Sequence, residues 1–351
     1  MLGAGSSSGR TIDVKSTEHV ASGSKAMRRR QLLHAVAAPA LAGGLAACGR
    51  APELPQANET LRLAIDLWPG YLPGVLADEL GWLSPERIQL KVFYPGDTDK
   101  MLADFTAGRY DVMGASLGDL ITITRGHLAV KVITITDESA GGDMVLARPG
   151  LKLRPDGHYT IGTNLGGFGE VFLQEFIRRQ HLESAQWSWV NADAAEVPSL
   201  LGAGKLDVGH TWDPYASRAV AAGAQRLFTS LDTPGLVSDV LVATNATIQR
   251  RSRLLKRFLR FWFQAVDWWL AHPDEARKLL ARRVNMEPER ISLQGLRLIN
   301  LPRNRQLMIG ADGKGPALAP IVQRYSDYFV DKGSVVRPLI PTDLLDGELL
   351  P

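Results

Sequence analysis

The chain has 351 residues, 45% of them hydrophobic and 22% charged, which allows two domains or one large one of ordinary globular composition. Residues 1–47 carry six of the basic and two of the acidic residues, so the remainder of the +3 chain holds 34 Lys and Arg against 35 Asp and Glu. A near-neutral body excludes the strongly basic surface typical of nucleic-acid binding, and a single cysteine excludes an intramolecular disulfide.

Residues 1–47 are predicted to be an N-terminal extension followed by a signal peptide. Residues 1–26 are rich in Ser, Gly and Thr and show no apolar periodicity. Arg28-Arg29-Arg30 then precede an apolar run over 32–47 that is short for a membrane span, which is typical of a secretory signal, either Tat-like or Sec. Because a signal sits at the N-terminus, we expect Met27 to be the true start.

The signal ends in Leu45-Ala46-Ala47-Cys48-Gly49, which resembles a bacterial lipobox with Cys48 as the lipidated residue. The alternative is a plain signal-peptidase site at an Ala-x-Ala-like sequence, with Cys48 incidental. We expect lipidation, because a lone cysteine at this position is otherwise hard to explain. Residues 48–59 would then be a tether, and the protein would be periplasmic or extracytoplasmic and lipid-anchored to the membrane.

From Leu61 onward the pattern predicts alternating strands and helices. In the first part of the chain we expect strands at 61–66, 88–94, 110–116, 130–136 and 144–147, and helices at 73–81, 98–107 and 117–125. After a Pro- and Gly-containing loop at 148–159, we expect strands at 159–162, 187–190, 206–211 and 236–243, and helices at 170–180 and 194–201. From Thr247 the chain is predicted to be helical, with an apolar stripe that packs into a core, and another helix is expected at 317–331.

One phrase occurs twice, 96 residues apart: Ala107-Gly108-Arg109-Tyr110-Asp111-Val112 and Ala203-Gly204-Lys205-Leu206-Asp207-Val208. In each copy a helix ends at Ala-Gly and an x-Asp-Val strand follows, so the two aspartates are expected to be scaffold residues that cap a neighbouring helix. The repeat predicts two similar lobes. We assign 60–147 and 240–351 to lobe 1 and 148–239 to lobe 2.

The expected fold class is α/β, a two-lobed clamshell in which each lobe is a mostly parallel sheet flanked by helices. The loops at the carboxyl ends of the strands would meet at the cleft, where open α/β sheets bind ligands. Several of these loops carry distinctive motifs, namely Trp68-Pro69-Gly70-Tyr71, the loop from Gly114 to Asp119, the loop from Asp137 to Asp143, Trp212-Asp213-Pro214, and Ser238-Asp239.

In this order the motifs resemble the substrate-binding proteins of ABC importers of the nitrate/sulfonate/taurine type, over about residues 60–270. The resemblance implies the type II fold of periplasmic binding proteins. It also implies capture of a small polar solute between the lobes, and delivery of that solute to an ABC permease in the inner membrane with its ATPase.

The candidate ligand-binding residues are the aromatic and polar side chains of the cleft loops. They are Trp68, Tyr71, Ser116, Asp119, Asp137, Ser139, Asp143, Asn164, Trp212, Asp213 and Asp239. Trp68 and Trp212 occupy corresponding places in the two lobes and suit a ligand platform, although either could instead pack at a lobe edge. Ser116 and Asp119 precede a helix, where they could hold an anion or cap the helix.

The loops contain several carboxylates and no Lys or Arg before Arg148. A bare anion such as nitrate or a sulfonate favours guanidinium groups, hydroxyls and helix N-termini. Two tryptophans with carboxylates suit an amine, a quaternary ammonium or a heterocycle better. A zwitterion such as taurine would satisfy both requirements.

Two rival functions remain open at this point. A biosynthetic enzyme of the same fold would need a reactive site. The sequence has no H-E-x-x-H, no G-x-S-x-G and no cysteine besides Cys48. We therefore expect that the protein is not an enzyme and binds no cofactor and no metal. A sensory binding protein would use the same clamshell as a transport protein, so the sequence does not separate the two.

Overall fold

The computed structural model describes residues 58–96, 98–124, 129–311 and 314–351. The chain divides into residues 1–54 and a compact unit, Pro55–Pro351, and only the second is described below. The predicted signal peptide, Met27, Cys48 and most of the tether therefore lie outside the described residues. Among the residues described, no helix has both the length and the apolar character to cross a membrane.

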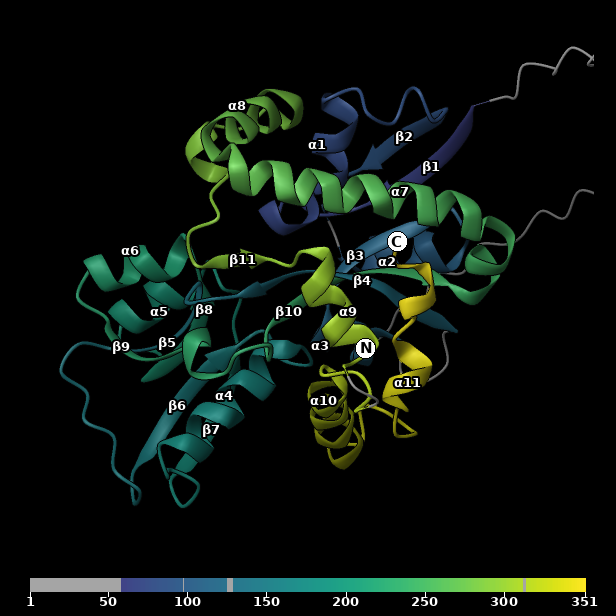
Figure 1. Ribbon diagram of the computed structural model, residues 1–351. Helices are drawn as coiled ribbons and strands as arrows, with labels where there is room; N and C mark the ends of the chain where they lie inside the picture. Colours follow the sequence, from purple (N-terminus) through teal and green to yellow (C-terminus); the bar gives the residue numbers. More distant parts are fainter. Residues whose placement is uncertain (1–57, 97, 125–128, 312–313) are drawn as a thin grey trace, which may run out of the picture. The chain divides into compact units, whose positions relative to one another are not determined.

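The first sheet has six strands in the order β11-β4-β10-β3-β1-β2 (Figure 1). Their bounds are β1 (Glu59–Ala64), β2 (Ile88–Phe93), β3 (Val112–Ser116), β4 (Val130–Ser139), β10 (Ser238–Thr244) and β11 (Leu296–Leu298). β1 is parallel to β2 and β3, whereas β10 runs antiparallel between β3 and β4. The chain therefore returns to this sheet after building the second lobe.

The second sheet has five strands in the order β7-β6-β8-β5-β9. They are β5 (Asp143–Ala147), β6 (His158–Thr163), β7 (Gln186–Asn191), β8 (Val208–Trp212) and β9 (Gln225–Thr229). The pairs β6–β7 and β6–β8 are parallel, while β5 is antiparallel to β8 and β9. Two lobes with mixed α/β sheets confirm the expected fold class, with β10 and β11 antiparallel to the other strands of the first sheet and β5 antiparallel to those of the second.

The position of β5 differs from the expected division at 147/148. β4 continues to Ser139, and a short turn containing Gly141, whose φ is 103°, leads directly into β5 of the second sheet. Left-handed backbone of this kind favours glycine, and it lets the chain change sheets within three residues. Sheet membership thus puts the first crossing at 140–142, before the Pro-rich loop that the sequence suggested.

Helices cover both sheets (Figure 1). They are α1 (Pro73–Glu79), α2 (Thr98–Thr106), α3 (Leu117–Thr124), α4 (Phe168–Arg179), α5 (Val197–Gly202), α6 (Tyr215–Ala221), α7 (Asn245–Ala271), α8 (Pro273–Val284), α9 (Leu301–Met308), α10 (Ala319–Asp331) and α11 (Pro341–Leu344). Short 3-10 turns lie at η1 (Pro69–Tyr71), η2 (Ser230–Asp232), η3 (Pro288–Arg290) and η4 (Gly347–Leu349).

The long helix α7 forms much of the core of the first lobe. The Thr244 side chain caps it by accepting a hydrogen bond from the backbone N–H of Thr247 at 3.1 Å. Its apolar stripe is buried, as the spacing predicts, with Phe258, Trp262 and Val266 fully inaccessible to solvent. α1 packs closely against this stripe because Gly74 has no Cβ. A Cβ at this position would lie only 2.7 Å from the Phe258 ring.

A second hydrophobic cluster is continuous through both lobes. It joins Val132 and Val240 of the first sheet to Ile161, Val208 and Phe228 of the second sheet through side chains of α3, α4 and α10. The bridging residues include Leu120 and Ile121 of α3, Phe172 and Phe176 of α4, and Val322, Tyr325 and Phe329 of α10. The lobes therefore share buried apolar packing as well as two chain crossings.

Asp111 and Asp207 of the repeated phrase have matching structural roles. Asp111 accepts a hydrogen bond from the backbone N–H of Arg62 at 2.9 Å, and Asp207 accepts one from the backbone N–H of Thr160 at 2.9 Å. Each carboxylate also binds a guanidinium, that of Arg62 at 2.9 Å or of Arg148 at 2.7 Å. The scaffold interpretation is confirmed, but helix capping is wrong: each aspartate ties its strand to the neighbouring parallel strand.

We expect Asp111→Ala to lower the free energy of unfolding by roughly 2 kcal/mol, because it leaves the backbone N–H of Arg62 and the Arg251 guanidinium, 2.6 Å from the carboxylate, without their acceptor. Denaturant unfolding followed by circular dichroism measures this change. Asp156→Ala is the control, because its ion pair with Arg154 is exposed on both sides and should leave stability unchanged. Equal effects of the two substitutions would contradict the assigned role of Asp111.

Candidate functional site

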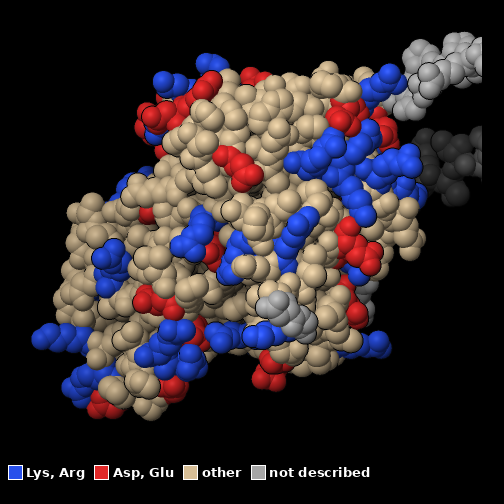
Figure 2. Space-filling view, in the orientation of Figure 1, with Lys and Arg blue, Asp and Glu red and all other residues tan. Residues whose placement is uncertain are grey.

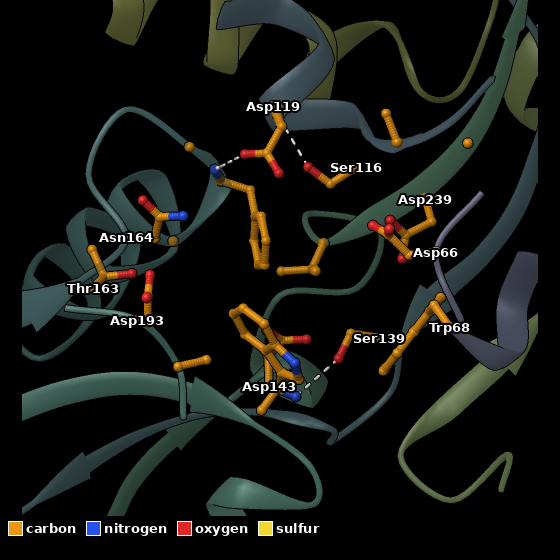
Figure 3. Close-up of a pocket in the computed structure, with 18 of the residues that line it drawn as sticks. Asp66, Trp68, Ser116, Asp119, Ser139, Asp143, Thr163, Asn164, Asp193 and Asp239 are labelled. Carbon is orange, nitrogen blue, oxygen red and sulfur yellow. Dashed lines mark hydrogen bonds between the residues drawn. The ribbon is translucent and has the colours of Figure 1, made fainter. Parts of the chain in front are cut away.

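A cavity of about 580 Å³ lies between the two lobes, at the carboxyl ends of strands from both sheets. The first lobe contributes residues that follow β1, β3 and β4, and the second contributes residues that follow β6, β7 and β8. Figure 3 shows Asp66, Trp68 and Asp239 on one side of this cavity and Thr163, Asn164 and Asp193 on the other. The cleft expected from the strand-end rule is therefore present in the described chain.

Nine of the predicted residues line the cavity. They are Trp68, Tyr71, Ser116, Asp119, Ser139, Asp143, Asn164, Trp212 and Asp239. Asp137 and Asp213 do not. Asp137 is fully buried behind Trp68, whose indole N–H donates to it at 3.1 Å. Asp213 accepts hydrogen bonds from the backbone N–H and the hydroxyl of Ser217, at 2.9 and 2.6 Å, so it caps the start of α6 instead of facing the cavity.

The sequence reasoning missed several lining residues, among them Asp66, Phe168, Asp193 and Tyr215. Asp66 and Asp193 each lie two residues beyond the end of a parallel strand, β1 and β7. The strand-end rule applied to every parallel strand would have found both. Phe168 gave no such signal, because it lies in a Gly-rich turn that could face either way.

Aromatic side chains form much of the cavity wall. The rings of Phe168 and Trp212 lie 5.8 Å apart, and both contact His210, with centroid distances of 5.4 and 5.8 Å. The His210 ring is itself fixed, because Nε2 lies 2.8 Å from Asp143 Oδ1 and Nδ1 lies 3.1 Å from Thr163 Oγ1. His210 is 1% exposed and therefore supports the wall through packing and hydrogen bonds.

Two carboxyl groups face each other at the base of the first lobe. Asp137 and Asp239 are register partners in the antiparallel pair of β4 and β10, and the hydroxyl of Tyr71 donates to Asp239 at 2.6 Å. Burial raises the pKa of Asp137 to about 6. Burial together with the neighbouring Asp137 charge raises the pKa of Asp239 well above its usual value. Protonation of the pair is therefore favoured more than that of an isolated carboxyl group, as expected for two carboxyl groups close together.

Ser116 and Asp119 lie at the start of α3, and Asp119 connects this lobe to the opposite one. The Ser116 hydroxyl accepts from the backbone N–H of Asp119 at 3.0 Å, which caps α3. The Asp119 carboxylate accepts from the backbone N–H of Phe168 at 3.1 Å, at the start of α4 in the second lobe. Burial raises the pKa of Asp119. These two contacts, drawn as dashed lines in Figure 3, engage the N-termini of both helices with protein oxygens.

The charge of the cavity is one-sided. Five carboxylic side chains line it, and no Lys or Arg does among the described residues. These five are Asp66, Asp119, Asp143, Asp193 and Asp239. No three or more described His, Cys, Asp or Glu side chains are grouped so that they could hold a metal ion. The arrangement suits a positively charged or hydrogen-bond-donating ligand held against aromatic faces.

Comparison with known structures gives the same architecture. The chain is similar to the periplasmic aliphatic sulphonate binding protein SsuA from Escherichia coli, with 16% identity, a TM-score of 0.64, and coverage of 82% of this chain and 92% of that one. It is also similar to the alkanesulfonate-binding protein SsuA from Xanthomonas axonopodis pv. citri bound to MOPS, with 14% identity, a TM-score of 0.59, and coverage of 84% and 99%.

A third similar structure is the Candida albicans CA3427 gene product, which has the generic periplasmic binding protein fold; it shares 12% identity, a TM-score of 0.59, and coverage of 81% of this chain and 93% of that one. No curated protein matches the sequence. The model of the NMT1/THI5-like family matches residues 68–276, which is more than half of the chain. The chain therefore belongs to the NMT1/THI5-like family and has the two-lobed fold of the periplasmic binding proteins.

Proposed function

We propose that this protein is the extracytoplasmic solute-binding component of an ABC importer, and that its solute is a small organic molecule bearing an amine, a quaternary ammonium or a protonated heterocycle. The observation that carries the proposal is the lining of the cavity, which combines five carboxylic side chains with the rings of Trp68, Phe168, Trp212 and Tyr215. Aromatic faces and carboxylates are the two groups that attract organic cations.

A bare sulfonate fits the same cavity less well. The two similar SsuA proteins bind sulfonates according to their names, and such an anion needs guanidinium groups or free backbone N–H groups. Here the N–H groups of Asp119 and Phe168, at the starts of α3 and α4, already donate to Ser116 and Asp119. These two N–H groups are therefore not free to hold the acidic group of a solute.

Capture would use both lobes. Trp68, Tyr71 and Asp239 belong to the first lobe, while Asp143 and Trp212 belong to the second. A solute can therefore bind first to the residues of one lobe and contact those of the other lobe when the lobes close. Because it makes more contacts in the closed form than in the open form, its binding favours the closed form. The Asp119–Phe168 hydrogen bond would be made only when the lobes meet.

Delivery to a permease with its ATPase, export by a Tat-like or Sec signal, and lipid anchoring at Cys48 complete the proposal. We assign no catalytic role: His210, the histidine of the cavity, is held between Asp143 and Thr163 and buried by aromatic rings. A sensory role would use the same capture. Solute uptake measured in a strain lacking the protein separates transport from sensing.

The test is a thermal-shift panel on the purified protein with three solute classes at matched concentrations. These are quaternary ammonium compounds, amines and aminopyrimidines in the first class, taurine-like zwitterions in the second, and alkanesulfonates in the third. We expect melting-temperature increases in the first class, because ligand binding to the native state stabilises it. Increases with alkanesulfonates alone would overturn the assigned solute class.

A further inference from the structure

The N-terminal half of α7 carries a concentration of positive charge. Residues 250–260 include six Lys and Arg and no Asp or Glu. Figure 2 shows these blue side chains gathered into one patch over α7. We define the α7 basic face as its exposed members, Arg250, Arg253, Lys256 and Arg260. The last three are spaced at i, i+3 and i+7, so they lie along one side of the helix, opposite the buried stripe.

Three of these six positive charges, those of Arg250, Arg253 and Lys256, are not neutralised by carboxylates of the described chain. Asp111 binds Arg62 and Arg251, Glu59 binds Arg257, and Glu86 binds Arg260. Among the described residues, no carboxylate lies within ion-pair distance of Arg250, Arg253 or Lys256. Since the chain after residue 47 is close to neutral, this local excess is a feature of one face and not of the whole surface.

The same face adjoins the point where the described chain begins. Glu59 and Thr60 open β1, and they contact α7 through the Arg257–Glu59 ion pair and the hydrogen bond from Arg251 to the Thr60 carbonyl. Cys48 precedes Glu59 by eleven residues, a segment that can reach at most about 40 Å. The basic side chains span only about 15 Å of helix, so the whole face lies within reach of the proposed anchor.

We propose that the α7 basic face rests on the anionic headgroups of the membrane that holds Cys48, so that acyl chain and basic face together fix the orientation of the protein. The inference rests on the anchoring in the proposed function. Its chemistry is that of two-signal membrane association, in which one lipid chain binds marginally and a polybasic patch adds the rest. Each Lys or Arg near an anionic surface strengthens binding by about fivefold.

The test uses the full chain with Cys48→Ser, so that no acyl chain contributes, in flotation with vesicles of phosphatidylcholine alone or mixed equally with phosphatidylglycerol. We expect binding only to the mixed vesicles, and its loss at 0.5 M NaCl, where exposed charges are screened. Arg250→Glu, Arg253→Glu and Lys256→Glu together should weaken binding at least tenfold. The matched control reverses Lys152, Lys205 and Arg226, three exposed charges of the second lobe.

Thermal melting establishes that both triple variants are folded. No binding to mixed vesicles, or equal loss in the control variant, would overturn the proposal. A third outcome would also overturn the proposal: the unmutated face does not bind vesicles, yet cells carrying the α7 variant lose solute uptake. In that case the α7 basic face would be assigned to contact with an acidic surface of another protein. Solute-induced melting shifts are measured separately on the same variants, so failure of the solute assignment is distinguished from failure of the membrane contact.

Discussion

Replacing Asp239 by asparagine is expected to weaken the binding of a quaternary ammonium solute by about ten- to a hundredfold, measured by isothermal titration calorimetry. Asp239 lines the cavity and lies opposite Asp137, so it is the carboxyl group best placed to become the counter-charge of a bound cation. Asparagine keeps the size of the side chain and an oxygen for the Tyr71 hydroxyl but cannot ionise. Folding should therefore be preserved while the charge is lost.

The pH dependence of the same affinity follows from the raised pKa values of Asp137 and Asp239. A bound cation favours the ionised pair, whereas the raised pKa values of Asp137 and Asp239 favour protonation of the pair in the free protein. Affinity for a solute of fixed charge should rise from pH 5 to pH 8, as protons leave groups such as Asp137 with its pKa of about 6. Asp239→Asn should flatten this rise.

Asp213→Asn is the matched control, because Asp213 caps α6 outside the cavity. It should leave the affinity and its pH dependence unchanged. Wild-type affinity in Asp239→Asn, or an equal loss in Asp213→Asn, would contradict the assignment of Asp239 as the counter-charge.

Phe172→Ala is expected to lower the free energy of unfolding by about 3–5 kcal/mol, the usual cost of removing a buried phenylalanine ring. Phe172 is fully buried in α4 and contacts the rings of His210 and Phe228, at 5.1 and 5.4 Å. Because its cluster also includes Leu120 of α3 and Tyr325 of α10, the loss should reach both lobes. Calorimetry should show one transition at a lower temperature.

Hydrogen exchange separates this result from a local effect. Amides of β3 in the first lobe should exchange faster in Phe172→Ala although the substitution lies in the second lobe, because the cluster couples the two. Leu231→Ala, at a side chain that is 60% exposed, should change stability by less than about 0.5 kcal/mol. Unchanged β3 exchange in Phe172→Ala would show that the lobes unfold independently.

Periodicity predicted the lobes and most of their elements because each strand and helix buries one regular face. The β11 strand is different: it spans three residues, with too little alternation to be recognised, and is held by β4 on one side. The β5 strand was found, but its sheet was not. Hydrogen-bonding partners are tertiary information, and the Gly141 turn that redirects the chain has the same composition as an ordinary loop.

The candidate site shows the same limit. The strand-end rule located Trp68, Ser116 and Trp212 at the cavity, because a parallel strand fixes where its loop emerges. It could not fix where a side chain in that loop points. Trp212 and Asp213 are adjacent, yet one faces the cavity while the other bonds to Ser217 of α6. The N–H and hydroxyl groups near the start of α6 bind the Asp213 carboxylate and so turn it away from the cavity.

The return of the chain to its first sheet has a consequence for how the protein is synthesised. β10 is inserted between β3 and β4, so it must close a loop of 98 residues, 140–237, before that sheet can form. The second lobe lies almost entirely within that loop, and the strands of its own sheet all belong to residues 143–229. Contacts between distant residues form slowly because the entropy of loop closure must be overcome first. Until residue 244 has emerged, β3 and β4 present unpaired edges, and a chain stopped before β10 is expected to aggregate.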